Sequence, residues 1–336
     1  MIWVATLILL LFASPAQAAV IFSQSFDGMT TQSVCATIAS EGGFNDCRED
    51  ESHPHAPGDV SIVESIPGYS GSMPSGAKVM RVHVDANTAQ GDAGVQIAGG
   101  TIDYIPPDSW IQFAMYVNNF GSELVSNLQN RPMKLLYPCK GSYPCGTDSR
   151  AGYFMLQTST GDSYAPFQDV SLDNNTTGDM WLLLRDNTEG TPAWMGYAAP
   201  GDRNKLGQTN LSERIRPNRW NIIRCHMNFT NTAAASAECW IGAKGSALTK
   251  VMEWIGGTTV EGESFTWTIP DATGHRYAWL PSTQGAGSTE YPQETFLYFD
   301  DYYVATTEGD LPTYTAADNR RFSPAFLRRV SQGVEP

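Results

Sequence analysis

Basic side chains are scarce in this sequence. It contains 21 lysine and arginine residues against 35 aspartate and glutamate residues, which gives a formal net charge of -14 at pH 7. Binding to nucleic-acid phosphates needs a basic surface, so this composition argues against a nucleic-acid partner. A groove that is locally basic would still accept an anionic polysaccharide.

Long apolar runs are absent beyond the first residues. The apolar run Ile2–Phe12 is followed by the small-residue sequence Ala16-Gln17-Ala18, and no lysine or arginine precedes the run. The run is short for a bilayer span, and its cleavage site is typical of a secretory signal. We therefore predict a signal peptide over residues 1–18, no membrane span, and secretion into the extracellular space or the periplasm.

The sequence also lacks a metal-binding cysteine motif. None of its six cysteines forms a C-x-x-C pair, which disfavours a zinc site. An even number of cysteines in an exported protein indicates disulfides, although sequence alone does not determine their connectivity. Each pair of neighbouring cysteines flanks a turn rich in Gly, Asn or Ala, which favours the pairs Cys35–Cys47, Cys139–Cys145 and Cys225–Cys239.

Helical periodicity is rare, and short alternating segments recur instead. Stretches rich in Gly, Pro, Asn, Asp and Ser separate these segments. The pattern predicts an all-β fold, a two-sheet antiparallel β-sandwich over residues 19–309, with a C-terminal extension over 310–336. The predicted strands are Lys78–Asp85, Trp110–Asn118, Met133–Tyr137, Tyr153–Ser159, Met180–Asp186, Trp220–Phe229, Glu238–Ala243, Val251–Ile255, Tyr277–Leu280 and Thr295–Thr306.

Alternation sorts the residues of each strand onto two faces. In one strand Ile111 and Phe113 are expected in the core, with Gln112 on the opposite face. In another, Cys225 is expected in the core, between Arg224 and His226 on the opposite face. The polar, aromatic and cationic residues on the outer faces could line a sugar groove, or they could simply be solvated.

Several of these segments resemble the concanavalin A-like jelly-roll superfamily of lectins, glucanases and polysaccharide lyases, including its laminin-G-like branches. The resemblance rests on WIQFAMYV followed by MKLLYP, on WNIIRCHMNFT leading into ECWIGAKG, and on the closing FLYFDDYYVAT. It covers roughly two-thirds of the chain and implies a fold more than an activity. The E-x-D-x-E strand of endo-glucanases is absent, as are the R-T-E-x-R, Gln-Ile-His and Y-F-K-x-G-x-Y strands of the best-known alginate lyases.

The resemblance and the outer-face residues together favour a lyase that acts on an acidic, uronate-containing polysaccharide. Removing the proton next to a uronate carboxylate needs a cation or amide on that carboxylate and a Tyr or His as base. We predict His226 or Tyr116 as the base, with Arg224, Lys134 and Gln112 holding the carboxylate. The predicted substrate-binding residues are Arg81, His83, Asn228, Tyr277 and Trp279.

Two other functions remain open. Aromatic rings in or near loops could stack on sugars in a non-catalytic carbohydrate-binding or adhesion protein; these are Trp194, Tyr197, Trp254, Trp267, Tyr277 and Trp279. Large aromatics also fill cores, which is the expectation for Trp110, Trp181, Trp220 and Trp240. A glycoside hydrolase is the third candidate.

Acidic residues mark the predicted junction of the first and last strands. Asp27 follows the strand-like segment Ile21–Gly28, which is expected to lie beside the closing strand with Asp300 and Asp301. A structural calcium ion would offset the cost of these neighbouring carboxylates. Alternatively, only one of the two adjacent acids faces inward and accepts from backbone N–H groups. No organic cofactor is expected.

Overall fold

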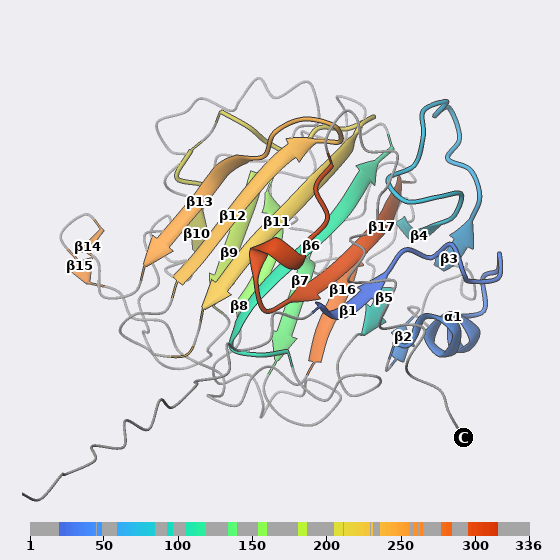
Figure 1. The fold of residues 1–336 in the computed structure, drawn as a ribbon, viewed down its shortest axis with the longest axis horizontal. Coiled ribbons are helices and arrows are strands. Elements are labelled where there is room, and N and C mark those ends of the chain that lie inside the picture. Colours follow the sequence, from blue (N-terminus) through green and yellow to red (C-terminus); the bar gives the residue numbers. More distant parts are fainter. Residues whose placement is uncertain are drawn as a thin grey trace, which may run out of the picture.

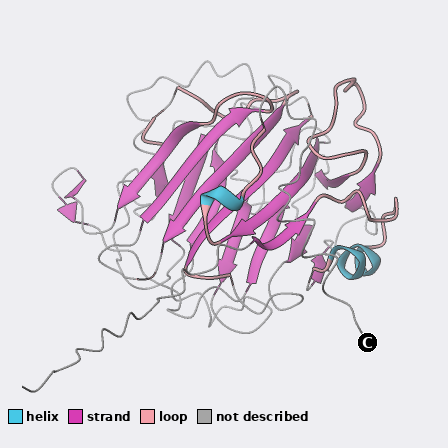
Figure 2. Ribbon diagram, in the orientation of Figure 1, coloured by secondary structure: helices cyan, strands magenta, loops and turns pink. Residues whose placement is uncertain are grey.

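The computed structural model describes residues 20–44, 46–48, 59–84, 93–96, 105–118, 134–139, 154–159, 181–186, 205–210, 212–228, 230, 236–255, 259–260, 263–264, 277–283 and 295–314. Two antiparallel sheets lie one behind the other (Figure 1), and strands form most of the regular structure (Figure 2). The predicted antiparallel β-sandwich is confirmed. The predicted signal peptide, Cys145, Trp194, Tyr197, Trp267 and residues 315–336 lie outside the described residues.

The front sheet in Figure 1 has eight strands. Its order is β13-β12-β11-β6-β17-β4-β3, and β1 pairs with β17. The bounds are β1 Val20–Gln24, β3 Val60–Val63, β4 Val79–Val84, β6 Asp108–Val117, β11 Trp220–Asn228, β12 Ser236–Ala243, β13 Thr249–Ile255 and β17 Thr295–Ala305.

The second sheet has seven strands in the order β10-β9-β8-β7-β16-β5-β2. The bounds are β2 Asp46–Arg48, β5 Ala93–Gln96, β7 Lys134–Cys139, β8 Phe154–Ser159, β9 Trp181–Asp186, β10 Lys205–Gly207 and β16 Tyr277–Thr283. A separate hairpin pairs β14 (Thr259–Val260) with β15 (Glu263–Ser264).

The main core lies between the two sheets. Strand β6 contributes Ile111 and Phe113 to it, and the seven-stranded sheet contributes Val95, Leu135 and Leu182. Full burial of one such side chain contributes about 1.5–3 kcal/mol to folding. The alternation predicted for β6 and β11 is therefore confirmed, because their other residues lie on the outer face of the eight-stranded sheet. Trp254, predicted as a loop aromatic, belongs to this core instead.

The last strand closes the sandwich. Strand β17 pairs with β6 and β4, and its final residues also pair with β1, so that Val20 lies opposite Ala305. The expected contact between the first and last strands is confirmed. The N-terminal segment can complete its pairing only against residues at the far end of the domain.

Two disulfides and one helix complete the described fold. The bonds Cys35–Cys47 and Cys225–Cys239 are both present, as predicted, and the partner predicted for Cys139 lies outside the described residues. Helix α1 (Cys35–Gly42) was not predicted from periodicity; it ends at Gly43, whose φ of 67° suits glycine. Among the described residues, no helix is long and apolar enough to cross a membrane.

The C-terminal segment, defined here as Thr306–Tyr314, turns back over the outer face of the eight-stranded sheet. It contains the short 3-10 helix η3 (Glu308–Asp310), which lies in front of the central strands in Figure 1. Leu311 is buried against Tyr303 in a small apolar cluster. Packing therefore continues past residue 309, where the sequence placed the end of the domain.

Candidate functional site

The strand order divides the predicted site residues between two sheets. Gln112, Tyr116, Arg224, His226, Asn228, Arg81 and His83 belong to the eight-stranded sheet, whereas Lys134, Tyr277 and Trp279 belong to the seven-stranded sheet. The inner faces of both sheets form the core, so their outer faces lie on opposite sides of the molecule. The three strands whose outer faces were expected to line a groove, β4, β6 and β11, share one sheet, but Lys134, Tyr277 and Trp279 cannot join them there. Alternation predicts the face of a residue within its strand, but not the sheet that the strand joins.

Arg224 and Gln112, predicted to hold a uronate carboxylate, bind the protein's own C-terminal segment. Arg224 Nε donates to Gln112 Oε1 at 2.7 Å, and its Nη1 donates to Glu308 Oε1 at 2.7 Å. Arg224 Nη2 and Gln112 Nε2 both donate to the carbonyl oxygen of Pro312, at 3.2 and 3.0 Å. These contacts anchor the segment to the sheet.

His226, predicted as the base, lies between two carboxylates. Its Nε2 is 2.8 Å from Asp108 Oδ1 and its Nδ1 is 3.5 Å from Glu238 Oε2, while its ring stacks on Trp110 with centroids 4.4 Å apart. Asn228 Nδ2 also donates to Asp108, at 3.4 Å. Two carboxylates beside the imidazole would repel a uronate, so this environment does not suit an anionic substrate.

Glu238 connects His226 to the next strand. Lys250 Nζ donates to Glu238 Oε1 at 2.5 Å and to Glu253 Oε1 at 2.9 Å, and lies 5.2 Å from the centroid of the Trp240 ring. Partial burial would raise the pKa of Glu238, but the hydrogen bonds and charges of Lys250 and His226 outweigh it and hold that pKa below its ordinary value. This carboxylate therefore stays ionised at neutral pH.

Tyr116, the alternative base, is buried in an aromatic cluster with Tyr69, Trp220 and Tyr298. Its ring centroid is 5.1 Å from that of Tyr69 and 5.6 Å from that of Trp220. Burial raises the pKa of Tyr116. Burial also raises the pKa of Tyr298, to about 12, and the nearby Tyr116 adds a smaller effect. A phenol that is 3% exposed and harder to ionise cannot reach a polysaccharide, so the prediction of Tyr116 as base is wrong.

Arg81 and His83 contact their own sheet near its edge. Arg81 Nε donates to Ser61 Oγ at 2.9 Å, and its guanidinium lies 5.3 Å from the centroid of the Phe296 ring. His83 is buried and stacks on the same ring at 4.7 Å. The two residues predicted to bind substrate pack against Phe296 in the structure.

The outer face of the eight-stranded sheet thus has two distinct halves. The aromatic half consists of Tyr116, Trp220 and Tyr298, and Tyr69 from the loop between β3 and β4 packs against it. The polar half consists of Trp110, Gln112, Arg224, His226, Trp240 and Lys250. Trp110 and Trp240, which were expected in the core, are only partly buried here and stack on each other with centroids 5.5 Å apart.

Two of the acidic residues predicted to bind calcium, Asp300 and Asp27, accept hydrogen bonds from nearby residues of one loop. Asp300 Oδ2 accepts from Ser75 N at 2.7 Å, and Asp300 Oδ1 accepts from Ser75 Oγ at 2.5 Å and from Asp301 N at 2.8 Å. Asp27 Oδ1 accepts from the backbone N–H groups of Ala77 and Lys78, at 2.8 and 3.2 Å. Within the described residues, no group of three or more acidic, His or Cys side chains forms a cation site. Calcium binding stays a prediction from the sequence.

A β-bulge explains how two adjacent acids lie on one side of the sheet. The pairing of β17 with β6 shifts between Asp300 and Tyr303, and Asp301 has a φ of 50°. The bulge inserts one residue and interrupts the alternation. Burial, and then the charge of Asp301, raise the pKa of Asp300 well above its ordinary value.

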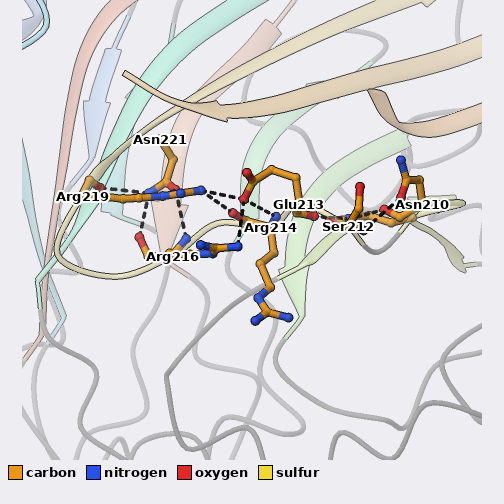
Figure 3. Close-up of polar contacts among 8 residues, drawn as sticks. Asn210, Ser212, Glu213, Arg214, Arg216, Arg219 and Asn221 are labelled. Carbon is orange, nitrogen blue, oxygen red and sulfur yellow. Dashed lines mark hydrogen bonds and ion pairs between the residues drawn. The ribbon is translucent and has the colours of Figure 1, made fainter. Parts of the chain in front are cut away.

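A basic cluster that sequence reasoning missed lies where the chain passes from β10 to β11. Arg219 Nη2 donates to Glu213 Oε1 at 2.8 Å, and Asn221 Oδ1 accepts from Arg219 Nε at 2.9 Å and from Arg216 N at 3.0 Å (Figure 3). Arg214 also belongs to this segment and points away from Asn221 (Figure 3). Three arginines against one glutamate make the segment locally basic, and their close spacing in the sequence was the available signal.

Comparisons with known proteins support the fold. No family model and no curated protein matches this sequence. The PL-14 alginate lyase from Aplysia kurodai is similar in structure, with a TM-score of 0.54 and 14% identity over 85% of this chain and 99% of that chain. The endo-β-1,4-glucuronan lyase from Trichoderma reesei has a TM-score of 0.49 and 12% identity over 87% of this chain and 98% of that chain.

At such low identity the similarity to the alginate lyase shows the fold alone. The chain is a jelly-roll β-sandwich, so the fold implied by the sequence resemblance is confirmed. Activity has to be argued from the residues themselves.

Proposed function

We propose that this protein is a secreted polysaccharide lyase that cleaves a uronate-containing polysaccharide on the outer face of its seven-stranded sheet. The observation that carries the proposal is the jelly-roll architecture, which is similar to that of an alginate lyase over 85% of this chain. The two disulfides fit an oxidising compartment, which supports export.

The opposite sheet supports this choice of face. Its aromatic half is buried, and its polar half carries the C-terminal segment and several carboxylates. In the seven-stranded sheet, Val95, Leu135 and Leu182 fill the core on the inner side, so the proposal assigns the substrate to the outer side.

Three of the predicted residues, Lys134, Tyr277 and Trp279, belong to two neighbouring strands of this sheet. Strands β7 and β16 are neighbours, with Ser282 opposite Lys134, Trp279 opposite Tyr137, and Tyr277 opposite Cys139. Strand β8 adds Gln157 opposite Lys134 on the other side. A lysine, tyrosines, a tryptophan and a glutamine are the residue types that uronate binding and proton transfer need.

In the proposed reaction Lys134 stabilises the uronate carboxylate, and a tyrosine or histidine removes the proton from the neighbouring ring carbon. The electron pair of the broken C–H bond forms a carbon–carbon double bond, and the glycosidic C–O bond on the adjacent carbon breaks. The leaving oxygen takes a proton from an acid, and the base keeps the proton that it removed. The products are a new chain end and an unsaturated uronate.

The basic cluster supports an anionic substrate. Arg214, Arg216 and Arg219 lie in the connection between the seven-stranded and eight-stranded sheets, and the Arg216 side chain is 44% exposed. In a protein with a net charge of -14, such a local concentration of positive charge would guide a polyanion to this end of the sandwich.

The test is to incubate the protein with alginate, glucuronan, ulvan and glycosaminoglycans and to follow the ultraviolet absorbance of the unsaturated product. We expect a gain on one of these polymers, a loss of at least about a hundredfold in rate for Lys134→Ala, and a smaller loss for Tyr277→Phe, which lies farther along the sheet. His226→Ala is the deciding comparison, because the prediction from sequence expects it to lose activity and our proposal expects it to remain active.

Other outcomes would overturn the proposal in distinct ways. New reducing ends without the absorbance gain would identify a glycoside hydrolase. Binding to a polysaccharide with no cleavage would identify a non-catalytic carbohydrate-binding protein. Lost activity in a folded His226→Ala protein would move the site to the eight-stranded sheet.

A further inference from the structure

A pocket of about 420 Å³ lies in the polar half of the eight-stranded sheet. The proposed lyase site is on the other sheet, on the opposite side of the molecule. Strands β11 and β12, the turn after β12 and the C-terminal segment form its walls. Its lining includes Arg224, Trp240, Ser246, Leu248, Glu308 and Tyr314. The proposed lyase reaction uses none of these residues.

The turn that forms one wall is fixed from two sides. Lys244 Nζ donates to the carbonyl oxygens of Ser72 and Met73, both at 2.8 Å, which ties the turn to a distant loop. On the strand side, a Cβ at Gly242 would lie 2.8 Å from the carbonyl oxygen of Ala247. The turn therefore packs directly on β12, and only glycine leaves room for it. The pocket is formed before any ligand arrives.

The C-terminal segment forms the facing wall and is anchored equally well. Arg224 uses three of the five N–H groups of a guanidinium to bind Gln112, Glu308 and Pro312. The Glu308 side chain remains 54% exposed, so its carboxylate can also accept hydrogen bonds from a ligand. The pocket thus presents a rigid donor and an accessible acceptor side by side.

The remaining lining combines the rings of Trp240 and Tyr314 and the side chain of Leu248 with the hydroxyl groups of Ser246 and Thr313. Trp240 stacks on Trp110, which in turn stacks on His226, whereas Leu248 packs against the aromatic half. A few fixed polar groups next to an aromatic and aliphatic surface match the alternating hydroxyl and C–H surfaces of a sugar ring.

We propose that this pocket is a second carbohydrate site, which binds a neutral hexose unit of a glycan. The charge balance selects the neutral sugar, because Glu308 already matches Arg224 at 2.7 Å and the carboxylates of Asp108, Glu238 and Glu253 lie on the same face. A uronate would compete with Glu308 for the guanidinium and meet this negative charge. The site would hold the protein on a neutral glycan while the other sheet faces an acidic one.

The test is calorimetric titration with neutral tetrasaccharides of glucose, mannose and galactose, alongside uronate tetrasaccharides as charged probes. Ala247→Trp, at an exposed position of the pocket wall, fills the pocket, and Ala36→Trp adds the same side chain at an exposed position of helix α1. We expect millimolar binding of one neutral tetrasaccharide, a loss of about tenfold or more in Ala247→Trp, and no change in Ala36→Trp.

Three results would overturn the second site. They are the absence of neutral binding up to about 10 mM, neutral binding that Ala247→Trp leaves intact, and a preference for uronate tetrasaccharides that Ala247→Trp removes. The absorbance assay on uronate polymers, run on the same variants, keeps this proposal separate from the lyase. We expect Ala247→Trp to retain the rate of the unmodified protein, and a lost rate would make the pocket part of the substrate site.

Discussion

On the outer face of the eight-stranded sheet, similar residues have opposite roles in the aromatic half and in the polar half. Both contain large rings at alternating positions of the same strands: Tyr116 and Trp110 lie six positions apart on β6, and both face outward. Tyr116 is covered by the loop of Tyr69 and becomes core, whereas Trp110 remains partly exposed beside charged groups. The covering segment, more than the strand residue, decides whether an outward ring stabilises the fold or is available to a ligand.

Truncating a ring in each half should give the clearest separation. Trp220→Ala empties a site that is 2% exposed and is expected to cost about 3–5 kcal/mol of unfolding free energy. Trp110→Ala removes a partly exposed ring and should cost about 1 kcal/mol. Urea unfolding of both variants measures the difference, and equal losses would mean that the two halves do not differ as described.

Asp300, a buried carboxylate that accepts a hydrogen bond from Ser75, sharpens the comparison through the pH dependence of stability. Because the pKa of Asp300 is raised in the folded state, its contribution to stability is complete below its ordinary pKa of 3.8. That contribution is lost as the pH rises through the raised value. Asp300→Asn should therefore show a weaker loss of stability between acidic and neutral pH than the unmodified protein.

The measurement is the unfolding free energy of both proteins across that pH range. Glu238→Gln is a matched carboxylate change in the polar half, where the pKa is lowered rather than raised. It should shift the pH dependence in the opposite direction, because its ionised form is the one that the fold stabilises. Parallel pH profiles for the two variants would contradict the opposite pKa shifts of Asp300 and Glu238.

The smallest effect is expected where the C-terminal segment meets the polar half. Glu308→Gln removes the charge of a half-exposed ion pair with Arg224, which should cost at most about 1 kcal/mol. Hydrogen exchange should nevertheless accelerate locally in the C-terminal segment, because Glu308 is one of its anchors on the sheet. A global acceleration would show that the segment is an integral part of the core.

Much of the fold followed from the sequence because period-two alternation records burial directly. It placed Phe113 inward and Gln112 outward, and it brought the first and last strands together. It failed where long-range pairing decides the outcome. Nothing in the spacing of Lys134 and Arg224 indicates that their strands join different sheets.

The errors at the candidate site have equally physical causes. The bulge at Asp301 breaks the alternation, so the two adjacent acids do not face opposite ways. The burial of Tyr116 depends on a loop far from it in sequence. The hydrogen bonds of Arg224 are made to the segment after the last strand. The residue types alone did not indicate which of these groups are accessible.

The pairing of β1 with β17 also constrains when the protein can fold. Val20 finds its partner Ala305 only after nearly the whole domain has emerged, so this closure depends on contacts of very long sequence separation. We expect the N-terminal strand to dock last and slowly. A newly made chain would then remain open at this edge until its last strand has been synthesised.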